Sequence, residues 1–239
     1  MSMIALALDT SEARGSVAVR RDGRTVAVRP HEVAADYSSW LLGATEDALR
    51  EAAATMKSVE LLAVSTGPGS FTGVRVGLTT VKAWAEVYGK PIVGVSRLES
   101  MARAGEPCGF VAASYDAQRG QIFGGLYRWV DGAMKAVEAE MVTAPGAFVA
   151  LVEENAGTES VRWVTLDPQL ISSAAGWGVR ERRGDRLIAC TADVASLIGE
   201  LAEERATRGE FTDALELDAN YVRRSDAEIL WKGPASSVR

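Results

Sequence analysis

Three features of this sequence have residue types and spacings suited to chemistry: a glycine-rich stretch, a lone histidine, and an aspartate that ends an apolar run. The stretch at residues 67–70 (Gly-Pro-Gly-Ser) follows the apolar residues 61–64, which are typical of a strand buried on both faces. Glycine allows a sharp turn, and Ser70 or Thr72 can cap a helix that runs to about Tyr88. A helix start presents unpaired amides and the positive end of a dipole, so phosphate binding is the first hypothesis.

The established phosphate-binding motifs do not match this stretch. A P-loop needs a second glycine five residues after the first, followed by lysine. Five residues after Gly67 the sequence has Thr72, and five residues after Gly69 it has Val74. The dinucleotide fingerprint fails as well, because its next glycine comes one position late, at Gly73. A purely structural glycine turn therefore stays open beside phosphate binding.

Other catalytic chemistries find little support. A two-metal nuclease needs several carboxylates together, but Asp9 ends its strand alone and no acid falls on the glycine turn. His31 is the only histidine, which excludes a two-histidine metal site, and we expect it at the surface or at a helix entry. Ser70 lacks the G-x-S-x-G setting of a hydrolase nucleophile. No catalytic residue and no metal site is predicted.

Composition limits the class of protein. With 239 residues, 47% of them hydrophobic, the chain can form a substantial core, and a net charge of -6 argues against a broad basic surface for nucleic acid. Cys108 and Cys190 are far apart and fit ordinary buried thiols of a cytosolic protein. The apolar start of the chain meets Asp9 too early for a signal peptide, and no apolar run is long enough to cross a bilayer. We expect a cytoplasmic protein with no membrane contact.

The elements that position these residues follow from the apolar pattern. Three strands come first, with Asp22-Gly23 as a hairpin turn before the third, and a helix follows at residues 36–54. The predicted strands cover residues 4–8, 15–20, 24–29, 61–64 and 92–95, and residues 96–104 form a short helix and a link. The order β-β-β-α-β-α-β is that of the ribonuclease-H-like fold.

A second half repeats the first. Asp116 ends a strand as Asp9 does, and Asp131-Gly132 matches Asp22-Gly23 as a hairpin turn. The predicted strands are 110–115, 121–129, 134–142 and 161–166, the helices are 145–154 and 192–207, and residues 167–186 have no clear pattern.

Two such halves in tandem describe an α/β protein of the actin-like ATPase superfamily, with a reduced second half that has too few residues for the usual nucleotide-pocket inserts. We expect an N-terminal ribonuclease-H-like domain at 1–103 that carries the partner-binding helices, a smaller second one at 104–218 and a tail at 219–239.

The helix after the glycine turn has two distinct faces. Val74, Leu78, Val81 and Ala85 can cover the sheet. The small residues Gly73, Gly77 and Thr80, followed by Trp84, form a lane on another face. We expect this lane to face the helix at 36–54, another protein, or both.

Several segments together resemble the bacterial TsaB (YeaZ) family, which acts in the biosynthesis of N6-threonylcarbamoyladenosine in tRNA. The match covers most of the chain, and its glycine segment is highly specific. It rests on residues 6–11 (LALDTS), 67–77 (GPGSFTGVRVG), 94–99 (GVSRLE), 116–123 (DAQRGQIF) and, loosely, 220–223 (NYVR).

The resemblance implies a noncatalytic, actin-like relative of TsaD, the subunit that transfers threonylcarbamoyl to adenosine 37 of tRNA. It implies docking of the first domain's two helices on TsaD, and a homodimer through the same surface when TsaD is absent. It also implies that the ATPase TsaE joins the complex, that tRNA is contacted only through the complex, and that no cofactor is intrinsic. The interface residues expected from it are Tyr37, Leu41, Thr45, Gly73, Val76, Gly77, Thr80 and Trp84.

The resemblance further implies that ATP or ADP can lie near the partner interface. The candidate nucleotide-proximal residues are Asp9, Thr10, Ser11, Gly67, Gly69 and Ser70. The family has also been labelled a peptidase M22 family of glycoproteases, which the residues here do not support. The alternative is a stand-alone enzyme of the superfamily, an ATP-dependent kinase or an M22-like glycoprotease, that uses Asp9, Asp116 and the glycine turn.

Overall fold

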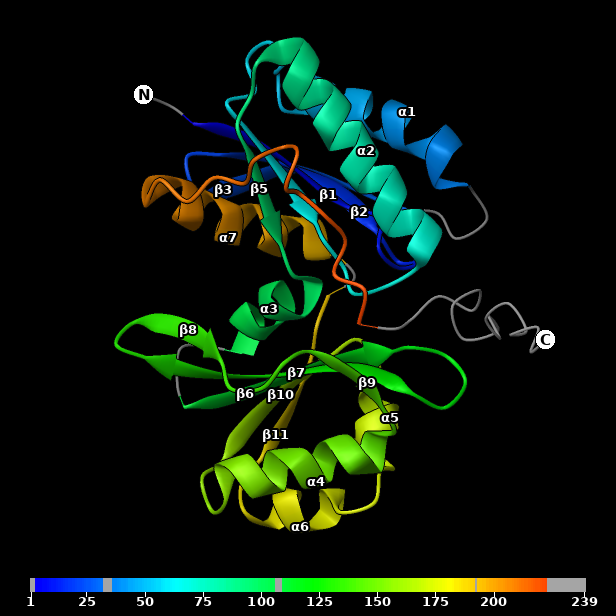
Figure 1. Cartoon of the computed structure of the whole chain (residues 1–239), viewed down its shortest axis with the longest axis vertical. Helices are drawn as coiled ribbons and strands as arrows, with labels where there is room; N and C mark the ends of the chain where they lie inside the picture. Colours follow the sequence, from blue (N-terminus) through cyan, green and yellow to red (C-terminus); the bar gives the residue numbers. More distant parts are fainter. Residues whose placement is uncertain (1–2, 32–35, 106–108, 192, 223–239) are drawn as a thin grey trace, which may run out of the picture.

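The first sheet contains five strands in the order β3-β2-β1-β4-β5, and its first three strands form the predicted antiparallel meander (Figure 1). The computed structural model describes residues 3–31, 36–105, 109–191 and 193–222. Strand β1 pairs antiparallel with β2 and parallel with β4. Asp22 and Gly23 form the hairpin turn with φ angles of 53° and 76°, as a two-residue turn with this twist requires. The strands are β1 (Ile4–Asp9), β2 (Ser16–Arg21), β3 (Arg24–Pro30), β4 (Leu61–Ser65) and β5 (Ile92–Val95).

Two helices, α1 (Tyr37–Glu51) and α2 (Phe71–Tyr88), cover the outer face of this sheet. Ser70 caps α2 by accepting a hydrogen bond from the amide of Gly73, and Gly89 ends the helix in the left-handed region at φ 61°. The predicted limits of α2 are confirmed. Helix α1 is shorter than the predicted 36–54, because Ala53 has a φ of 48° and cannot continue a right-handed helix.

The second sheet repeats the arrangement of the first. Its strand order is β11-β10-β6-β7-β8, so the central strand again has an antiparallel neighbour on one side and a parallel one on the other. The predicted duplication is confirmed. The elements are β6 (Phe110–Asp116), β7 (Ile122–Val130), β8 (Ala133–Ala136), β9 (Met141–Thr143), α4 (Pro145–Ala156), β10 (Val161–Thr165), α5 (Pro168–Ser172), α6 (Trp177–Arg182) and β11 (Arg186–Ala189).

The single strand predicted at residues 134–142 is wrong. Two short strands, β8 and β9, both pair with β7 at different positions along it. The last bond before the break runs from the amide of Val137 to the carbonyl of Leu126. The chain then leaves the ladder, and Glu140 instead accepts hydrogen bonds from the hydroxyls of Ser96 and of Tyr127 on β7. The alternating pattern of the sequence did not reveal this interruption.

The helices that follow the last strand of each half exchange partners. Helix α3 (Arg97–Ala102), followed by a 3-10 turn (Arg103–Gly105), packs on the second sheet, whereas α7 (Val194–Thr207) packs on the first. Helix α7 thus belongs by sequence to the range predicted for the second half and by packing to the first sheet. Its predicted range began at Ala192, which lies outside the described residues, and Asp193 caps it.

These exchanges create five layers: α1 and α2, the first sheet, α3 and α7, the second sheet, and α4 to α6 (Figure 1). The central hydrophobic core runs through both halves, joining Ala7 and Val95 of the first sheet to Ala113 of the second through Leu98 and Ile198. Each outer helical layer has its own core. None of the helices formed by the described residues has the length and apolar character that a membrane span requires.

After α7 the chain returns to the first sheet. Thr212 forms a bridge with Ile92 at the edge of β5, and Leu217 is buried in the core beneath α1 and α2. The amide of Asn220 donates to the carbonyl of Thr66 at 2.7 Å. The last described residues therefore lie beside the glycine turn.

Candidate functional site

The glycine turn joins β4 to α2, and its amides are used within the chain. The amide of Gly67 donates to Ser65 Oγ at 3.2 Å, and that of Ser70 donates to the carbonyl of Ser11 at 2.7 Å. A Cβ on Gly69 would lie 1.9 Å from the same carbonyl oxygen, so this close approach requires glycine. A phosphate at this turn would have to displace these contacts.

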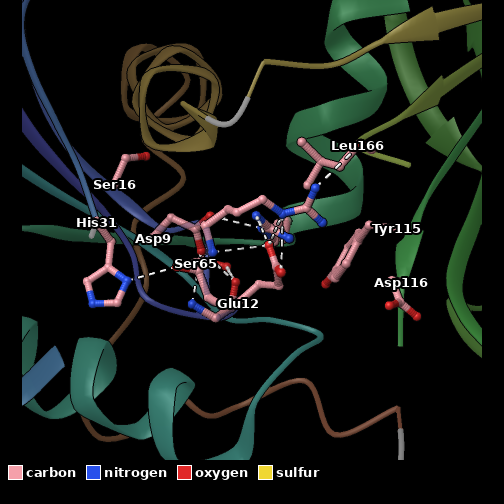
Figure 2. Close-up of polar contacts among 12 residues, drawn as sticks. Asp9, Glu12, Ser16, His31, Ser65, Tyr115, Asp116 and Leu166 are labelled. Carbon is pink, nitrogen blue, oxygen red and sulfur yellow. Dashed lines mark hydrogen bonds and ion pairs between the residues drawn. The ribbon is translucent and has the colours of Figure 1, made fainter. Parts of the chain in front are cut away.

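Behind the turn, Asp9 forms a buried ion pair with Arg97 (Figure 2). Arg97 Nε donates to Asp9 Oδ2 at 2.9 Å, while Oδ1 accepts from the amide and hydroxyl of Ser11 at 3.1 and 2.5 Å. Burial disfavours the charge of Arg97, but the Asp9 carboxylate, Tyr115 and Glu12 outweigh it and raise its pKa. The Asp9 carboxylate is therefore committed to a structural partner.

Arg97 also connects the two halves. Its guanidinium lies over the ring of Tyr115, 4.5 Å from the ring centre, and its Nη2 is 3.5 Å from a carboxylate oxygen of Glu12. The hydroxyl of Tyr115 donates to the carbonyl of Pro68 in the glycine turn. Burial raises the pKa of Tyr115, so the phenol stays protonated and serves as a donor.

A second ion pair closes the cleft between the halves. Arg14 donates from Nη1 and Nη2 to the two carboxylate oxygens of Asp167, both at 3.1 Å. Asp167 Oδ2 also accepts from the amide of Asp116, at 3.0 Å. The strand end of the second half is thereby tied to the loop that follows β1 in the first half.

The predicted nucleotide-proximal residues are only partly brought together at this cleft. A cavity of about 250 Å³ is lined by Ser11, Glu12, Ala13, Gly69, Ser70, Asp116, Ala117, Gln118 and Phe123. Asp9, Thr10 and Gly67 are not in the lining. The cavity lies below the roughly 300–1,000 Å³ of typical ligand pockets, and its two charged lining residues are acidic, which disfavours a polyphosphate. Nucleotide binding stays a prediction that this geometry does little to support.

A larger apolar groove of about 570 Å³ lies between α1 and α2 on the outer surface. Leu42 and Phe71 on its walls are 56% and 42% exposed, so two large apolar side chains lie together at the surface beside this groove. Among the residues that the structure describes, Arg75 is the one charged residue of the lining. The lining residues are Ser38, Leu41, Leu42, Phe71, Thr72, Arg75, Val76, Thr79 and Thr80.

The predicted interface residues divide between this groove and the interior. Leu41, Val76 and Thr80 line the groove. Tyr37 lines an adjoining cavity of about 420 Å³. Thr45 is buried and donates to the carbonyl of Leu41. Trp84 is half-buried and packs against the core beneath the two helices.

The small-residue lane packs on the first sheet at Gly73 and Gly77, while Gly73 also lines the cavity of about 420 Å³ and Thr80 lines the groove. Both glycines are buried against the residue after β1: added Cβ atoms would lie 2.1 Å from the carbonyl oxygen of Thr10 and 2.4 Å from its Oγ1. Thr10 Oγ1 donates to the carbonyl of Gly73 at 2.7 Å. The glycines let α2 lie close on the end of β1, and their place in a partner surface stays a prediction.

His31 lies at the entry to α1, as expected. Its Nδ1 is 2.8 Å from the carbonyl oxygen of Ala13, and its ring stacks on Tyr37 with centres 3.9 Å apart. Trp40 meets the same ring edge-on. The hydroxyl of Tyr37 donates to the carbonyl of Glu12. This aromatic cluster fixes the start of α1 to the loop after β1.

Glu140 and Arg97 are site residues that sequence reasoning missed. Glu140 accepts from the hydroxyl of Ser96, from that of Tyr127 at 2.6 Å and from Asn220 Nδ2 at 2.6 Å. Burial raises its pKa despite these three donors. Arg97 was part of a segment that carried the family resemblance, but its partner Asp9 lies far away in the sequence. Glu140 has no comparable sequence signal.

The cysteines show no reactive or metal-binding arrangement within the described part of the chain. Cys190 is free and half-buried, and burial raises the pKa of its thiol to about 11. Cys108 lies outside the described residues. Within the ranges that the structure describes, no three His, Cys, Asp or Glu residues are grouped so that they could hold a metal ion.

Two similar halves, packed through exchanged helices, define an α/β protein with two tandem ribonuclease-H-like halves. A similar fold is found in component A of (R)-2-hydroxyglutaryl-CoA dehydratase from Acidaminococcus fermentans. Its solved structure aligns over 86% of this chain and 99% of its own, with a TM-score of 0.52 at 10% identity, which shows the fold alone.

Comparisons of sequence then identify the family. Residues 21–167 match the family model of TsaD, tRNA N6-adenosine threonylcarbamoyltransferase. The tRNA threonylcarbamoyladenosine biosynthesis protein TsaB of Bacillus subtilis (strain 168) is 32% identical over 96% of this chain and 98% of its own length. A solved Pseudomonas aeruginosa protein described as similar to peptidase YeaZ aligns over 92% of this chain and 100% of its own, with a TM-score of 0.72 at 28% identity. The chain belongs to the TsaB (YeaZ) family.

Proposed function

We propose that this chain is a noncatalytic subunit that binds and activates TsaD during threonylcarbamoyl transfer to adenosine in tRNA. Membership of the TsaB family supports a role in this modification. The similar B. subtilis protein is named for biosynthesis of threonylcarbamoyladenosine in tRNA, and it aligns with this chain over nearly its whole length. The match of residues 21–167 to the TsaD model supports a relation to the transferase itself.

The groove between α1 and α2 is the observation that carries the proposed contact. Exposed Leu42 and Phe71 beside a cavity of about 570 Å³ leave apolar surface that a partner helix could cover. Thr79 and Thr80 have small side chains on the α2 side of the groove, so a partner could approach α2 closely.

The noncatalytic role is supported by the state of the strand-end acid. Asp9 is fully buried and paired with Arg97, so using it to hold a metal or activate a nucleophile would require breaking that pair. The sequence also has a single histidine, which cannot supply a paired-histidine metal site.

The remaining partners belong to the same proposal. TsaE would join the complex formed with TsaD, tRNA would be contacted only through that complex, and ATP or ADP would lie near the interface rather than in this chain's own cleft. A homodimer through the α1–α2 surface in the absence of TsaD would cover the same apolar residues. Such a complex would work in the cytoplasm, where tRNA is modified.

Substitution of exposed groove residues tests the contact. Leu42→Glu and Thr79→Arg should each abolish co-purification with the cognate TsaD, because both place a charge on the apolar surface without touching the core. Ala150→Arg, an exposed position on α4 at the opposite side of the molecule, is the matched control and should bind normally. Circular dichroism would confirm that all three variants are folded.

A threonylcarbamoyladenosine assay completes the test. Product formation by TsaD should depend on this chain and fall with Leu42→Glu or Thr79→Arg. Normal binding by both variants would overturn the interface. Robust ATP turnover by the purified chain alone, lost in a folded Asp9→Asn variant, would favour a stand-alone enzyme instead.

A further inference from the structure

We propose that the C-terminal tail of this chain docks in its own α1–α2 groove, with Ile229, Leu230 and Trp231 as the segment that fills it. Residues 223–239 lie outside the described part of the chain, and this apolar triplet stands among polar and small residues there. The inference rests on where the described chain ends, how far the tail extends, and the chemistry of the two surfaces.

The described chain ends at the edge of the groove. The ring of Tyr221 stacks on that of Phe71 with centres 5.0 Å apart, and Arg75 Nε donates to the Tyr221 hydroxyl at 2.8 Å. Phe71 and Arg75 both line the groove. Asn220 anchors the preceding backbone on Thr66. The first residues of the tail are therefore held beside the groove by its own wall.

The length of chain beyond this anchor suffices to reach the groove. The lining of α2 runs from Phe71 to Thr80, which corresponds to about 14 Å along a helix. The seven peptide steps from Val222 to Ile229 span up to roughly 24 Å when extended and about 10 Å when helical. Either conformation is long enough for the apolar triplet to reach the groove.

The chemistry of the tail fits the lining. Ile229, Leu230 and Trp231 supply the large apolar side chains that the cavity beside Leu42 and Phe71 can accept. Asp226 and Glu228 precede them, after Arg223 and Arg224, and Arg75 is the charged residue of the lining within the part of the chain that the structure describes. The acidic pair is opposite in charge to Arg75, and the apolar triplet is suited to the exposed apolar side chains of Leu42 and Phe71.

Tethering makes even a weak contact effective. A segment joined by a short linker is present at an effective concentration of roughly millimolar, so an intrinsic affinity in that range already populates the bound state. If α1 and α2 form the TsaD-binding surface, the docked tail competes with TsaD. That competition rests on the proposed function, whereas the docking itself does not.

Quenching of a fluorophore by Trp231 tests the docking in the full-length protein. Cys108→Ser and Cys190→Ala remove the native thiols, and Thr79→Cys then places a bimane label on the groove wall. Tryptophan quenches bimane only at contact distance, so Trp231→Phe should raise the emission by about twofold or more if the tail occupies the groove most of the time. A bimane at Ala150→Cys on α4 should be unaffected by Trp231→Phe.

The outcomes distinguish a groove occupied by the chain's own tail from one occupied by the tail of a second copy. Emission that changes with Trp231→Phe and stays constant on dilution supports docking within one chain. Equal emission with and without the Trp231→Phe substitution, or a difference that vanishes on dilution, overturns it, the latter indicating the tail of a second copy.

A separate measurement addresses competition. Ile229→Asp with Leu230→Asp should tighten TsaD binding by about tenfold if the docked form is nine-tenths populated. Unchanged affinity together with tail-dependent quenching would overturn the competition while leaving the docking intact. Loss of TsaD binding in Thr79→Arg alone tests the proposed surface independently.

Discussion

At the residue scale, Gly77 is restricted by close packing rather than by backbone conformation. Its Cβ position lies 2.4 Å from Thr10 Oγ1, and that hydroxyl is held by its hydrogen bond to Gly73. We predict that Gly77→Ala destabilises the protein by about 1–3 kcal/mol, despite the better helix propensity of alanine, because α2 must move away from β1. Urea unfolding would measure the change.

Gly43 provides the matched control. It lies in α1, is exposed, and has open space around its Cβ position. Gly43→Ala should stabilise the protein by about 0.5–1 kcal/mol, since only helix propensity changes. Equal effects of the two substitutions would contradict the packing argument for Gly77.

The buried pair of Asp9 and Arg97 gives a second prediction at this scale. Arg97→Met leaves the Asp9 carboxylate buried without its charge partner, and we expect a loss of about 3–5 kcal/mol in the free energy of unfolding. Adding Asp9→Asn should recover part of this loss, because the uncompensated charge disappears. Additive effects of the two substitutions in a double-mutant cycle would show that the pair is not coupled.

At the element scale, the loop between β8 and β9 attaches the second half to the C-terminal segment through Glu140. Burial raises the pKa of this carboxyl group in the folded protein, so its protonated form is favoured by folding. The associated stability is complete below the pKa of the unfolded chain and is lost as the pH rises through the folded pKa. Glu140→Gln cannot titrate and should lack this component of the pH dependence.

Unfolding midpoints in urea between about pH 4 and pH 8 would measure the contribution of Glu140 to the pH dependence of stability. The stability of the natural protein relative to Glu140→Gln should fall as the pH rises through this range. Tyr127→Phe removes a donor that lowers the pKa of Glu140 and should extend the fall to higher pH. Parallel pH profiles for all three proteins would contradict the assignment.

Sequence patterns predicted where the helices and strands lie better than they predicted what packs against each one. The apolar run before the glycine turn and the cap at Ser70 placed β4 and α2 correctly, because both signals are local. The lane of Gly73 and Gly77 had the right spacing, but periodicity does not reveal which surface covers a face. Arg97 and Glu140 depend on partners far away in the sequence, so only the fold could show their roles.

At the scale of the whole molecule, the exchange of α3 and α7 makes the two halves share one core. Neither α3 nor α7 covers the sheet of its own half, although the internal repeat predicts equivalent positions for them. Contacts within a repeat are encoded by local pattern, whereas this exchange depends on how two finished sheets pack. For that reason the sequence boundary near residue 104 does not separate two independent cores.

A shared core predicts cooperative unfolding of both halves. Ile198 of α7 is fully buried between the sheets, and Ile198→Ala should cost about 2–5 kcal/mol through lost contacts and a cavity. Because the core continues into both sheets, hydrogen exchange should accelerate in β1 and β6 together. Phe148→Ala, in the separate core beneath α4, should produce the same joint response if unfolding is global. Acceleration in only one sheet for each substitution would instead show that the halves open independently despite their exchanged helices.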